Sequence, residues 1–302
     1  MAGLSGIINV RKPAGMTSHD VVARLRRILR TKKTGHTGTL DPDAEGVLPV
    51  CVGRATKVAD MLTASDKEYI AGVVLGFETD TQDISGSVTE RRDMRDFNIS
   101  AAELSGVLAG FWGASEQIPP MYSAIKVGGK KLYELAREGI EVERKPRPIN
   151  ISRIELLEFS PDDGNITNFK IKVSCSKGTY IRTLCSDIGK RLKCFGCMSS
   201  LVRTRSGRFS IKHSYTLSEI EDMYMRGDMS FLVPVDKVFS EFKRLEVDDK
   251  TAFRICNGIT VNSPAAAAEG EIFRVYNKEG KFLTISEYRG EALKTLKTFY
   301  QE

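Results

Sequence analysis

The sequence predicts an α+β protein with a small β-rich domain at its C-terminal end. Helical and strand patterns alternate along the chain without a fixed repeat, and its 302 residues fit two domains of about 150 residues or one large one. Residues 169–175 alternate apolar and polar side chains, which is typical of a half-buried strand. Two further apolar runs, 272–276 and 282–288, flank Asn277-Lys278-Glu279-Gly280, so the final segment should contain a β-hairpin.

Composition excludes a membrane-spanning chain and a mainly disordered one. Hydrophobic residues make up 41% of the sequence. The longest apolar run, 70–77, is far shorter than the roughly 18 residues that a bilayer span needs. The first ten residues lack the basic start and apolar core of a signal peptide. Six cysteines are too few for a disulfide scaffold and suit a reducing compartment, so we expect a cytoplasmic protein with no membrane association.

The N-terminal segment predicts a short strand, a turn and a basic amphipathic helix. Residues 7–10 form an apolar run, Lys12-Pro13-Ala14-Gly15 has turn chemistry, and Thr17 or Ser18 can cap a helix. Apolar side chains then fall on one arc of the helix and basic ones on the opposite arc. The apolar set is Val21, Val22, Leu25, Ile28 and Leu29, and the basic set is Arg24, Arg26, Arg27 and Arg30. The basic face can bind phosphates or simply be solvated.

Farther along, the chain divides into loops, an insertion and a connecting segment. Residues 34–46 contain several glycines and a proline, which excludes regular structure and predicts an ordered loop or a linker. Residues 116–148, with Pro119-Pro120, Gly128-Gly129 and many basic side chains, resemble an insertion that can move. Residues 223–242 should connect two units. Strands are expected at 67–77, 149–159 and 169–175, and helices at 104–111, 131–138 and 181–192.

Two local motifs can carry chemistry. Asp41 lies between glycines and Pro42, where a backbone can be rigid without being regular, so its carboxylate is a candidate nucleophile. An Asp before a Pro is also a common turn former. Arg182 follows Gly178 where a strand ends and a helix begins; it can pair bidentately with a carboxylate or be an ordinary helix-start residue. The local pattern leaves both alternatives open at each position.

No metal or nucleotide site is predicted, whereas a nucleic acid partner is. Cys194 and Cys197 have CxxC spacing near Cys185, but no second pair or histidine stands at ligand spacing. Phosphate-binding glycine motifs are missing. Basic residues form clusters at 24–33, 126–131, 144–147 and 203–212. Because 39 acidic residues nearly match the 45 basic ones, the acids must lie elsewhere, which predicts a positive face despite a net charge of only +6.

Five motifs in order resemble the TruB family of tRNA pseudouridine synthases over nearly the whole chain. They are Lys12-Pro13-Ala14-Gly15-Met16-Thr17-Ser18, Gly35-His36-Thr37-Gly38-Thr39-Leu40-Asp41-Pro42, Lys67-Glu68-Tyr69, Gln117-Ile118-Pro119-Pro120-Met121-Tyr122-Ser123-Ala124-Ile125-Lys126 and Ser176-Lys177-Gly178-Thr179-Tyr180-Ile181-Arg182. The resemblance implies a catalytic domain, residues 1–240, built on a mixed, largely antiparallel sheet with helices. It also implies an inserted RNA-gripping segment at 116–148 and a small PUA-like domain, residues 241–302, that contacts tRNA.

The same resemblance implies three catalytic residues. Asp41 is the catalytic carboxylate, acting as a nucleophile at the sugar or the base or abstracting a ribose proton; the sequence does not choose among these. Tyr69 stacks on the uracil and can help to remove the C5 proton. Arg182 pairs with Asp41. Since the net reaction is an isomerisation without redox chemistry or a group donor, we expect no cofactor and no metal.

Three more residues are expected to bind the substrate. Tyr180 lines the uracil pocket, and His36 helps to extrude the uridine and braces the vacated stack. Lys12, together with the basic clusters, contacts phosphates.

Two features depart from the family pattern. Asp43 and Glu45 stand where relatives commonly have a small or apolar residue and a Ser or Thr, and in a shared pocket they would raise the pKa of Asp41. We therefore expect both to point outward, with neither carboxylate within about 5 Å of Asp41. Val202 replaces a commonly basic residue and weakens at most one RNA contact.

The predicted function is conversion of the conserved uridine, U55, of the tRNA TΨC loop to pseudouridine, with Asp41 acting on a flipped-out base in a monomeric enzyme. The alternative is an RNA-binding or tRNA-folding module that does not depend on catalysis. A synthase of guided ribonucleoproteins is disfavoured because the chain lacks long basic tails and has its own PUA-like end.

Overall fold

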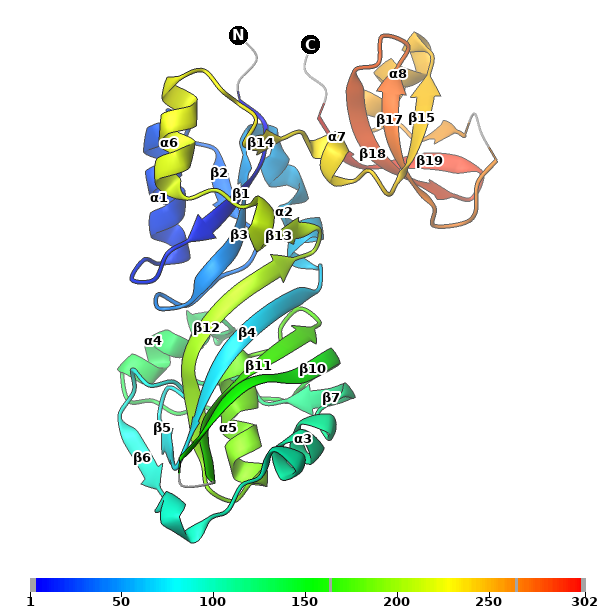
Figure 1. Ribbon diagram of the computed structural model, residues 1–302. Helices are drawn as coiled ribbons and strands as arrows, with labels where there is room; N and C mark the ends of the chain where they lie inside the picture. Colours follow the sequence, from blue (N-terminus) through cyan, green and yellow to red (C-terminus); the bar gives the residue numbers. More distant parts are fainter. Residues whose placement is uncertain (1–3, 163–164, 264–265, 300–302) are drawn as a thin grey trace.

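The computed structural model describes residues 4–162, 165–263 and 266–299 (Figure 1). Its largest element is a ten-stranded sheet with the order β14-β1-β3-β12-β4-β11-β10-β7, to which β13 is joined through β12 and β2 through β3. Its strand pairs are antiparallel except β3 with β12, which run parallel. The predicted mixed, largely antiparallel sheet is thereby confirmed.

The sheet and its helices have the following bounds. The strands are β1 (Gly6–Lys12), β2 (Thr34–His36), β3 (Glu45–Val52), β4 (Lys67–Leu75), β7 (Gly113–Gln117), β10 (Arg147–Asp162), β11 (Asn165–Cys175), β12 (Gly196–Ser206), β13 (Phe209–Ser210) and β14 (Leu232–Val233). The longer helices are α1 (Ser18–Ile28), α3 (Ala101–Ala109), α5 (Ile181–Arg191) and α6 (Leu217–Met225). Shorter helical segments are η1 (Gly53–Val58), α2 (Ala59–Thr63), η2 (Met94–Asp96), α4 (Leu132–Arg137), η3 (Ile211–His213) and α7 (Val235–Val238). Two small hairpins pair β5 (Phe77–Thr79) with β6 (Val88–Arg91) and β8 (Lys126–Val127) with β9 (Lys130–Lys131).

Helix α1 follows its sequence pattern closely. The Thr17 side chain accepts from the Asp20 N–H while the Asp20 carboxylate accepts from the Thr17 N–H, so a capping box starts the helix. The apolar arc is buried and the arginines are exposed, as expected. The helix therefore packs one face on the sheet and leaves the basic face to solvent.

Two apolar clusters cover the sheet near β1 and β3. Ile8 and Leu48 belong to one cluster, and their chain neighbours Ile7 and Val47 belong to the other. Successive side chains of a strand point to opposite faces, so this end of the sheet is buried on both faces. Because both faces are covered, a charged side chain on these strands must find its partners within the protein.

Three differences from the sequence-based expectations have a common cause. Residues 34–36 were expected to be irregular, but they form β2 because their main chain pairs with β3. The patterns do not predict β3, which contains Pro49, or β12, which carries several polar and basic side chains. In each case the pairing partner lies far enough away that the local pattern does not reveal it.

The C-terminal part forms a second, five-stranded sheet with the order β15-β17-β18-β19-β16. Its elements are β15 (Lys243–Val247), α8 (Asp249–Cys256), β16 (Val261–Asn262), β17 (Ile272–Asn277), β18 (Phe282–Arg289) and β19 (Ala292–Thr298). Strands β17 and β18 are the predicted hairpin. The unit has its own apolar core, and Figure 1 shows it joined to the large sheet through α7.

The C-terminal unit also contacts the first part of the chain directly. Ile285 and Phe299 share an apolar cluster with residues of β1 and β3. The Lys57 ammonium donates to the Thr298 carbonyl at 2.8 Å, and Lys297 pairs with Asp60 at 2.8 Å. The two sheets are therefore held together by both apolar packing and polar contacts. Over the described ranges, no helix has the length and hydropathy to cross a bilayer.

Candidate active site

The loop between β2 and β3 carries Asp41 and is fixed to the molecule at many points. Leu40 is buried, and the Ser18 hydroxyl bridges both its N–H and its carbonyl. The N–H of Gly15 donates to the Pro42 carbonyl at 3.0 Å. The loop is thus ordered without being helix or strand, which is what a preorganised catalytic side chain needs.

Lys12 holds this loop from within the protein. Its side chain is fully buried, and its ammonium donates to the carbonyls of Pro13, Pro42 and Ala44 at 2.8, 2.8 and 2.6 Å. An ammonium has three donors, so all are used. Burial lowers the pKa of Lys12, and the carboxylates around the loop act in the opposite direction. The Lys12 ammonium is thus directed at the carbonyls of the loop, and its expected contact with a phosphate stays a prediction.

Arg182, in the first turn of α5, pairs with Asp41. Its Nε lies 2.9 Å from Asp41 Oδ2, and its Nη2 donates to Oδ1 at 3.4 Å. The guanidinium side chain is 7% exposed and the Asp41 side chain 40% exposed, so the carboxylate is open on the side away from the arginine. The expected pairing is present, and it leaves the carboxylate accessible to a substrate.

The same guanidinium ties three segments together. Its Nη1 donates to the Thr81 carbonyl at 3.0 Å, and its Nη2 to the Tyr122 carbonyl at 2.8 Å. Asp83 Oδ2 lies 3.8 Å from Nε and adds a second carboxylate. Arg182 therefore connects the Asp41 loop with the β5–β6 turn and with the insertion, and each of its three nitrogens has a partner in one of these segments.

Tyr180, the residue before α5, is held by a side-chain amide. Gln117 Oε1 accepts from the Tyr180 N–H at 2.8 Å, and Gln117 Nε2 donates to the Tyr180 carbonyl at 3.0 Å. Gln117 is buried, whereas Tyr180 is partly exposed. The tyrosine backbone is therefore fixed, while the residue as a whole remains partly exposed.

His36 lies in β2, which leads into the loop, and Tyr69 lies in β4, which is separated from β3 by β12 in the sheet. Tyr69 in β4 is almost fully buried, and burial raises the pKa of its hydroxyl. The His36 ring packs edge-on against His19 of α1, with centroids 5.4 Å apart. Burial lowers the pKa of His36, and His19 acts in the same direction. His36 is thus neutral at pH 7, which suits packing against a base better than pairing with a phosphate.

The charged residues around the site divide into exposed and buried ones. Asp43 and Glu45 are exposed, in keeping with the expectation that they point outward. Arg203 was expected on the positive face but is buried. Arg208 donates to the carbonyls of Lys237 and Val238, both at 2.5 Å, so it secures α7. Arg203 and Arg208, two members of the 203–212 basic cluster, thus donate to main-chain carbonyls of the protein. These carbonyls belong to segments distant in the sequence, so the cluster by itself does not indicate them.

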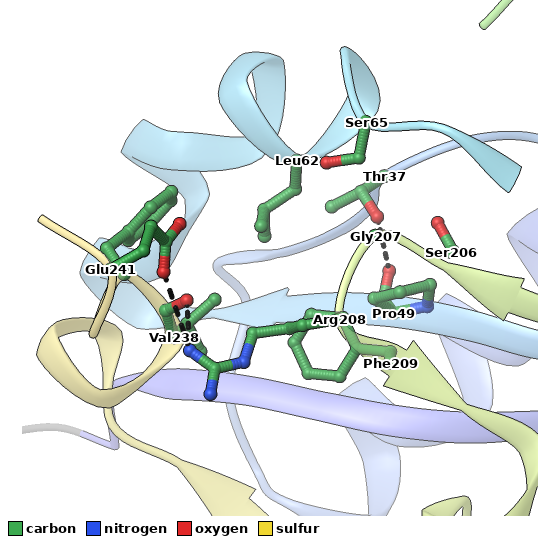
Figure 2. Close-up of a pocket in the computed structure, with 11 residues that line it drawn as sticks. Thr37, Pro49, Leu62, Ser65, Ser206, Gly207, Arg208, Phe209, Val238 and Glu241 are labelled. Atoms are coloured by element: carbon green, nitrogen blue, oxygen red, sulfur yellow. Dashed lines mark hydrogen bonds and ion pairs between the residues drawn. The ribbon is translucent and has the colours of Figure 1, made fainter. Parts of the chain in front are cut away.

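A cavity of about 180 Å³ opens near this cluster (Figure 2). It is lined by Thr37, Leu62, Ser65 and Phe209 among others, and Arg208 crosses it toward the α7 segment. None of the six predicted site residues lines it. The cavity belongs to the junction with α7 and is distinct from the surface around Asp41.

Sequence reasoning missed four residues that the structure brings to the site. These are His19, Asp83, Gln117 and Arg203. His19 lies in the segment that the helix pattern identified, and Gln117 lies in a motif that carries the family resemblance, but neither position by itself indicates its partner. All six cysteines are free thiols. Within the described ranges, no cluster of three or more metal-ligating side chains occurs.

Comparison with known proteins connects this fold and site to one enzyme class. Residues 26–181 match the model of the TruB family pseudouridylate synthase N-terminal domain, and residues 182–240 match that of the tRNA pseudouridylate synthase B C-terminal domain. The chain is 44% identical over 286 residues to tRNA pseudouridine synthase B of Bacillus pumilus, covering 93% of this chain and 92% of that protein. It is 43% identical over 286 residues to the protein of the same name from Bacillus subtilis, with the same two coverages.

Solved structures agree with the sequence comparisons. The protein of a Cbf5-Nop10-Gar1 complex is similar with a TM-score of 0.74 and 26% identity, over 98% of this chain and 85% of that chain. A protein of an H/ACA RNP bound to a substrate RNA is similar with a TM-score of 0.72 and 25% identity, at the same coverages. The similarity extends through the C-terminal unit.

The class follows from these findings: the protein is a pseudouridylate synthase, an isomerase that converts uridine to pseudouridine. Within that class, the chain belongs to the TruB family.

Proposed function

We propose that the protein converts uridine 55 in the T-loop of tRNA to pseudouridine, with Asp41 as the catalytic carboxylate. The observation that carries the proposal is the ion pair between Arg182 Nε and Asp41 Oδ2 at 2.9 Å. It occurs in a chain whose curated relatives at 43–46% identity are named tRNA pseudouridine synthase B. A carboxylate that is aimed by a buried arginine and open on its other side suits attack on an RNA substrate.

The chemistry needs a carboxylate and nothing redox-active. The bond between uracil N1 and ribose C1′ breaks, the base turns, and a bond from C5 to C1′ forms. The proton on C5 is lost and N1 gains one, so the product is an isomer and no cofactor or metal is consumed. Asp41 acts at the sugar or the base as a nucleophile, or removes a ribose proton, and Arg182 keeps its charge aimed.

The neighbouring aromatic residues have roles in holding the base. Tyr180, fixed through Gln117, lines the uracil pocket, and Tyr69 stacks on the uracil and assists loss of the C5 proton. His36 helps to extrude the uridine and braces the vacated stack. Extrusion costs a few kcal/mol, and a loop whose uridine is already poorly stacked lowers that cost.

The chain divides this work among three parts. Residues 1–240 form the catalytic domain, in which 116–148 grip the RNA, and residues 241–302 form a PUA-like domain that contacts tRNA. We propose that the enzyme acts as a monomer; the paired Asp41 and Arg182 come from one chain, so this pair does not need a second copy. It works in the cytoplasm, where its six thiols remain reduced and tRNA is available.

The test uses an unmodified tRNA transcript and its U55C variant. The wild-type protein should form one pseudouridine, at position 55, and none in the variant. Asp41→Asn, which keeps the shape of the side chain but removes its charge, should abolish product while RNA affinity changes by less than about 3-fold. Absence of pseudouridine with intact binding of the wild-type protein would contradict the proposed activity.

An RNA-binding or tRNA-folding module remains the alternative, and the Asp41→Asn protein separates the two. If the variant still promotes tRNA folding, both roles exist; if the wild type yields no product, only binding survives. A role in guided ribonucleoproteins is tested by comparing product from tRNA and from rRNA fragments. The structural neighbours from such complexes are 25–26% identical to this chain, against 43–46% for the tRNA enzymes.

A further inference from the structure

Arg203 lies in β12, between β3, which follows the Asp41 loop, and β4, which carries Tyr69. It is the Cα partner of Tyr69 across the antiparallel pair β12–β4 and of Gly46 across the parallel pair β12–β3. Opposed residues of neighbouring strands have Cβ atoms about 5 Å apart, so Arg203 stands directly beside Tyr69. The side chain is only 1% exposed and is among the largest fully buried ones.

The guanidinium reaches both sides of the Asp41 loop. Its Nη2 donates to the Gly38 carbonyl at 3.1 Å and its Nη1 to the Thr39 carbonyl at 3.4 Å, just before Asp41 in the chain. Its Nε donates to the Val47 carbonyl at 2.7 Å, just after the loop. One rigid, planar group therefore spans the two ends of the segment that carries the carboxylate. A lysine has the charge but not this fork of donors.

The backbone at Gly46 makes this arrangement possible. Gly46 has φ +102°, and a Cβ built on it would lie 2.3 Å from the Arg203 carbonyl oxygen. No other residue tolerates both the φ value and the close approach. Strands β3 and β12 can thus run close enough together for the Arg203 side chain to reach the loop carbonyls.

We propose that Arg203 is a positioning residue for the isomerisation, holding the Asp41 loop at a fixed distance from the strand that carries Tyr69. This inference rests on the proposed roles of Asp41 and Tyr69. Arg203 acts through these two residues. If the carboxylate and the phenol must meet one base from two sides, a small shift of the loop lowers the rate of the bound complex, because a displacement of about 1 Å can cost about 10²-fold.

A buried arginine that only stabilises the fold predicts something different. It would lower the amount of folded enzyme and leave the rate of each folded molecule unchanged. The chain offers a matched control in Arg274, which donates to the main-chain carbonyls of Asp236, Ser240 and Phe242. Arg274 lies in the C-terminal sheet and has the same chemistry without contact with the Asp41 loop. Each of its three nitrogens donates to a carbonyl in or near the segment that joins the two sheets, so Arg274 is assigned no contact with tRNA.

The first experiment compares Arg203→Lys with Arg274→Lys in the full-length protein. Single-turnover pseudouridine formation is measured at saturating tRNA, together with KM and urea unfolding. We expect Arg203→Lys to lower kcat about 30- to 100-fold with KM changed less than about 3-fold, and Arg274→Lys to change kcat less than about 3-fold. Equal kcat in Arg203→Lys and wild type, or an effect on KM alone, would overturn the proposal.

A chemical rescue keeps the test informative if the lysine variant is unstable. Arg203→Ala leaves a space that guanidinium ion can enter, so guanidinium at about 50 mM should restore at least about 10-fold of the lost kcat. Sodium chloride at the same concentration should not, nor should guanidinium change the rate of Arg274→Ala. Equal recovery with sodium chloride would show that the effect is a general salt effect and would refute positioning.

The outcome for the wild type separates this inference from the proposed function. If the wild-type protein forms no pseudouridine, the proposed activity itself is wrong. If the wild type is active, Asp41→Asn is inactive and Arg203→Lys has the wild-type rate, only the positioning role fails.

Discussion

The Asp41 loop and the insertion 116–148 use basic residues in opposite ways. The loop is held by two buried cations, Lys12 and Arg203, whose donors are directed to main-chain carbonyls. The insertion carries exposed cations, such as Lys126 in β8 and Lys145 in the irregular segment before β10, and it has few buried side chains. A buried cation orders the backbone around it, whereas an exposed one is free to meet phosphates.

The difference shows how one chain can combine a rigid loop that carries the carboxylate with exposed charges on a less restrained segment. The carboxylate must be aimed before the substrate arrives, so its loop is tied at several carbonyls. Under the proposed function, the insertion follows the shape of an RNA, and exposed charges on a segment with few buried side chains suit that role. Arg182 joins the two regions, because it contacts both Asp41 and the Tyr122 carbonyl.

The largest effect is expected when Arg182, which contacts both regions, is replaced. Arg182→Met should lower kcat at least about 10³-fold, because Asp41 loses its counter-charge and the Thr81 and Tyr122 carbonyls lose their donor. Arg182→Lys should retain more activity but not the wild-type rate, since it cannot make the forked contacts. Single-turnover rates at saturating tRNA check this, with Arg191→Met at the other end of α5 as the control. A wild-type rate in Arg182→Met would show that the pair is not needed.

Lys12→Met tests whether the first buried cation orders the loop or binds RNA. Loss of its three carbonyl contacts should lower kcat about 10²-fold and the free energy of unfolding by about 2 to 4 kcal/mol. The slope of log Kd for tRNA against log salt concentration should stay at the wild-type value, since no phosphate contact is lost. A slope reduced by about 1 would instead identify Lys12 as a phosphate ligand.

The exposed cations of the insertion should give the converse result. The double change Lys126→Ala and Lys145→Ala should weaken tRNA binding about 10-fold at moderate salt and reduce the salt slope by about 0.7 to 0.9 per lost phosphate contact. At saturating tRNA, kcat should remain within about 2-fold, since the Asp41 loop is untouched. Reduced kcat with unchanged affinity would mean that these lysines act on the site and not on the RNA backbone.

The smallest effect concerns pH and a third buried cation. Burial lowers the pKa of Lys67 in β4 to about 8, and its ammonium donates to the Thr63 and Ser65 carbonyls. Between pH 8 and about 10.5, the unfolded chain binds more protons at this group than the folded one, so the free energy of unfolding rises with pH.

The measurement compares wild type with Lys67→Met by urea unfolding at pH 7.5 and 9.5. The wild type should gain about 1 to 2 kcal/mol relative to the variant at the higher pH. Exposed Lys126→Met should show no such pH-dependent difference. A constant difference between wild type and Lys67→Met would show that the ammonium is not destabilised by burial.

The sequence by itself determined the features that neighbouring residues control. The cap and arcs of α1, the hairpin of β17 and β18, and the motif residues Asp41 and Arg182 follow from local spacing or from the family resemblance. In each case, the partners lie within a few residues or the motif itself marks the position. The class of fold could be predicted for the same reason, because strand and helix patterns are local.

Only the tertiary structure decided which basic side chains are buried and which carbonyls they bind. Lys12 and Arg203 look like surface residues in the sequence, because a basic side chain carries no sign of burial. Their acceptors are carbonyls up to 165 residues away in the chain, so neither periodicity nor spacing records them. The sequence likewise does not indicate the pairing of β2 with β3 or the hydrogen bonds between the Gln117 side chain and the Tyr180 main chain. Hydrogen bonds to a main chain depend on the path of the chain in space, because every residue type offers the same main-chain carbonyl.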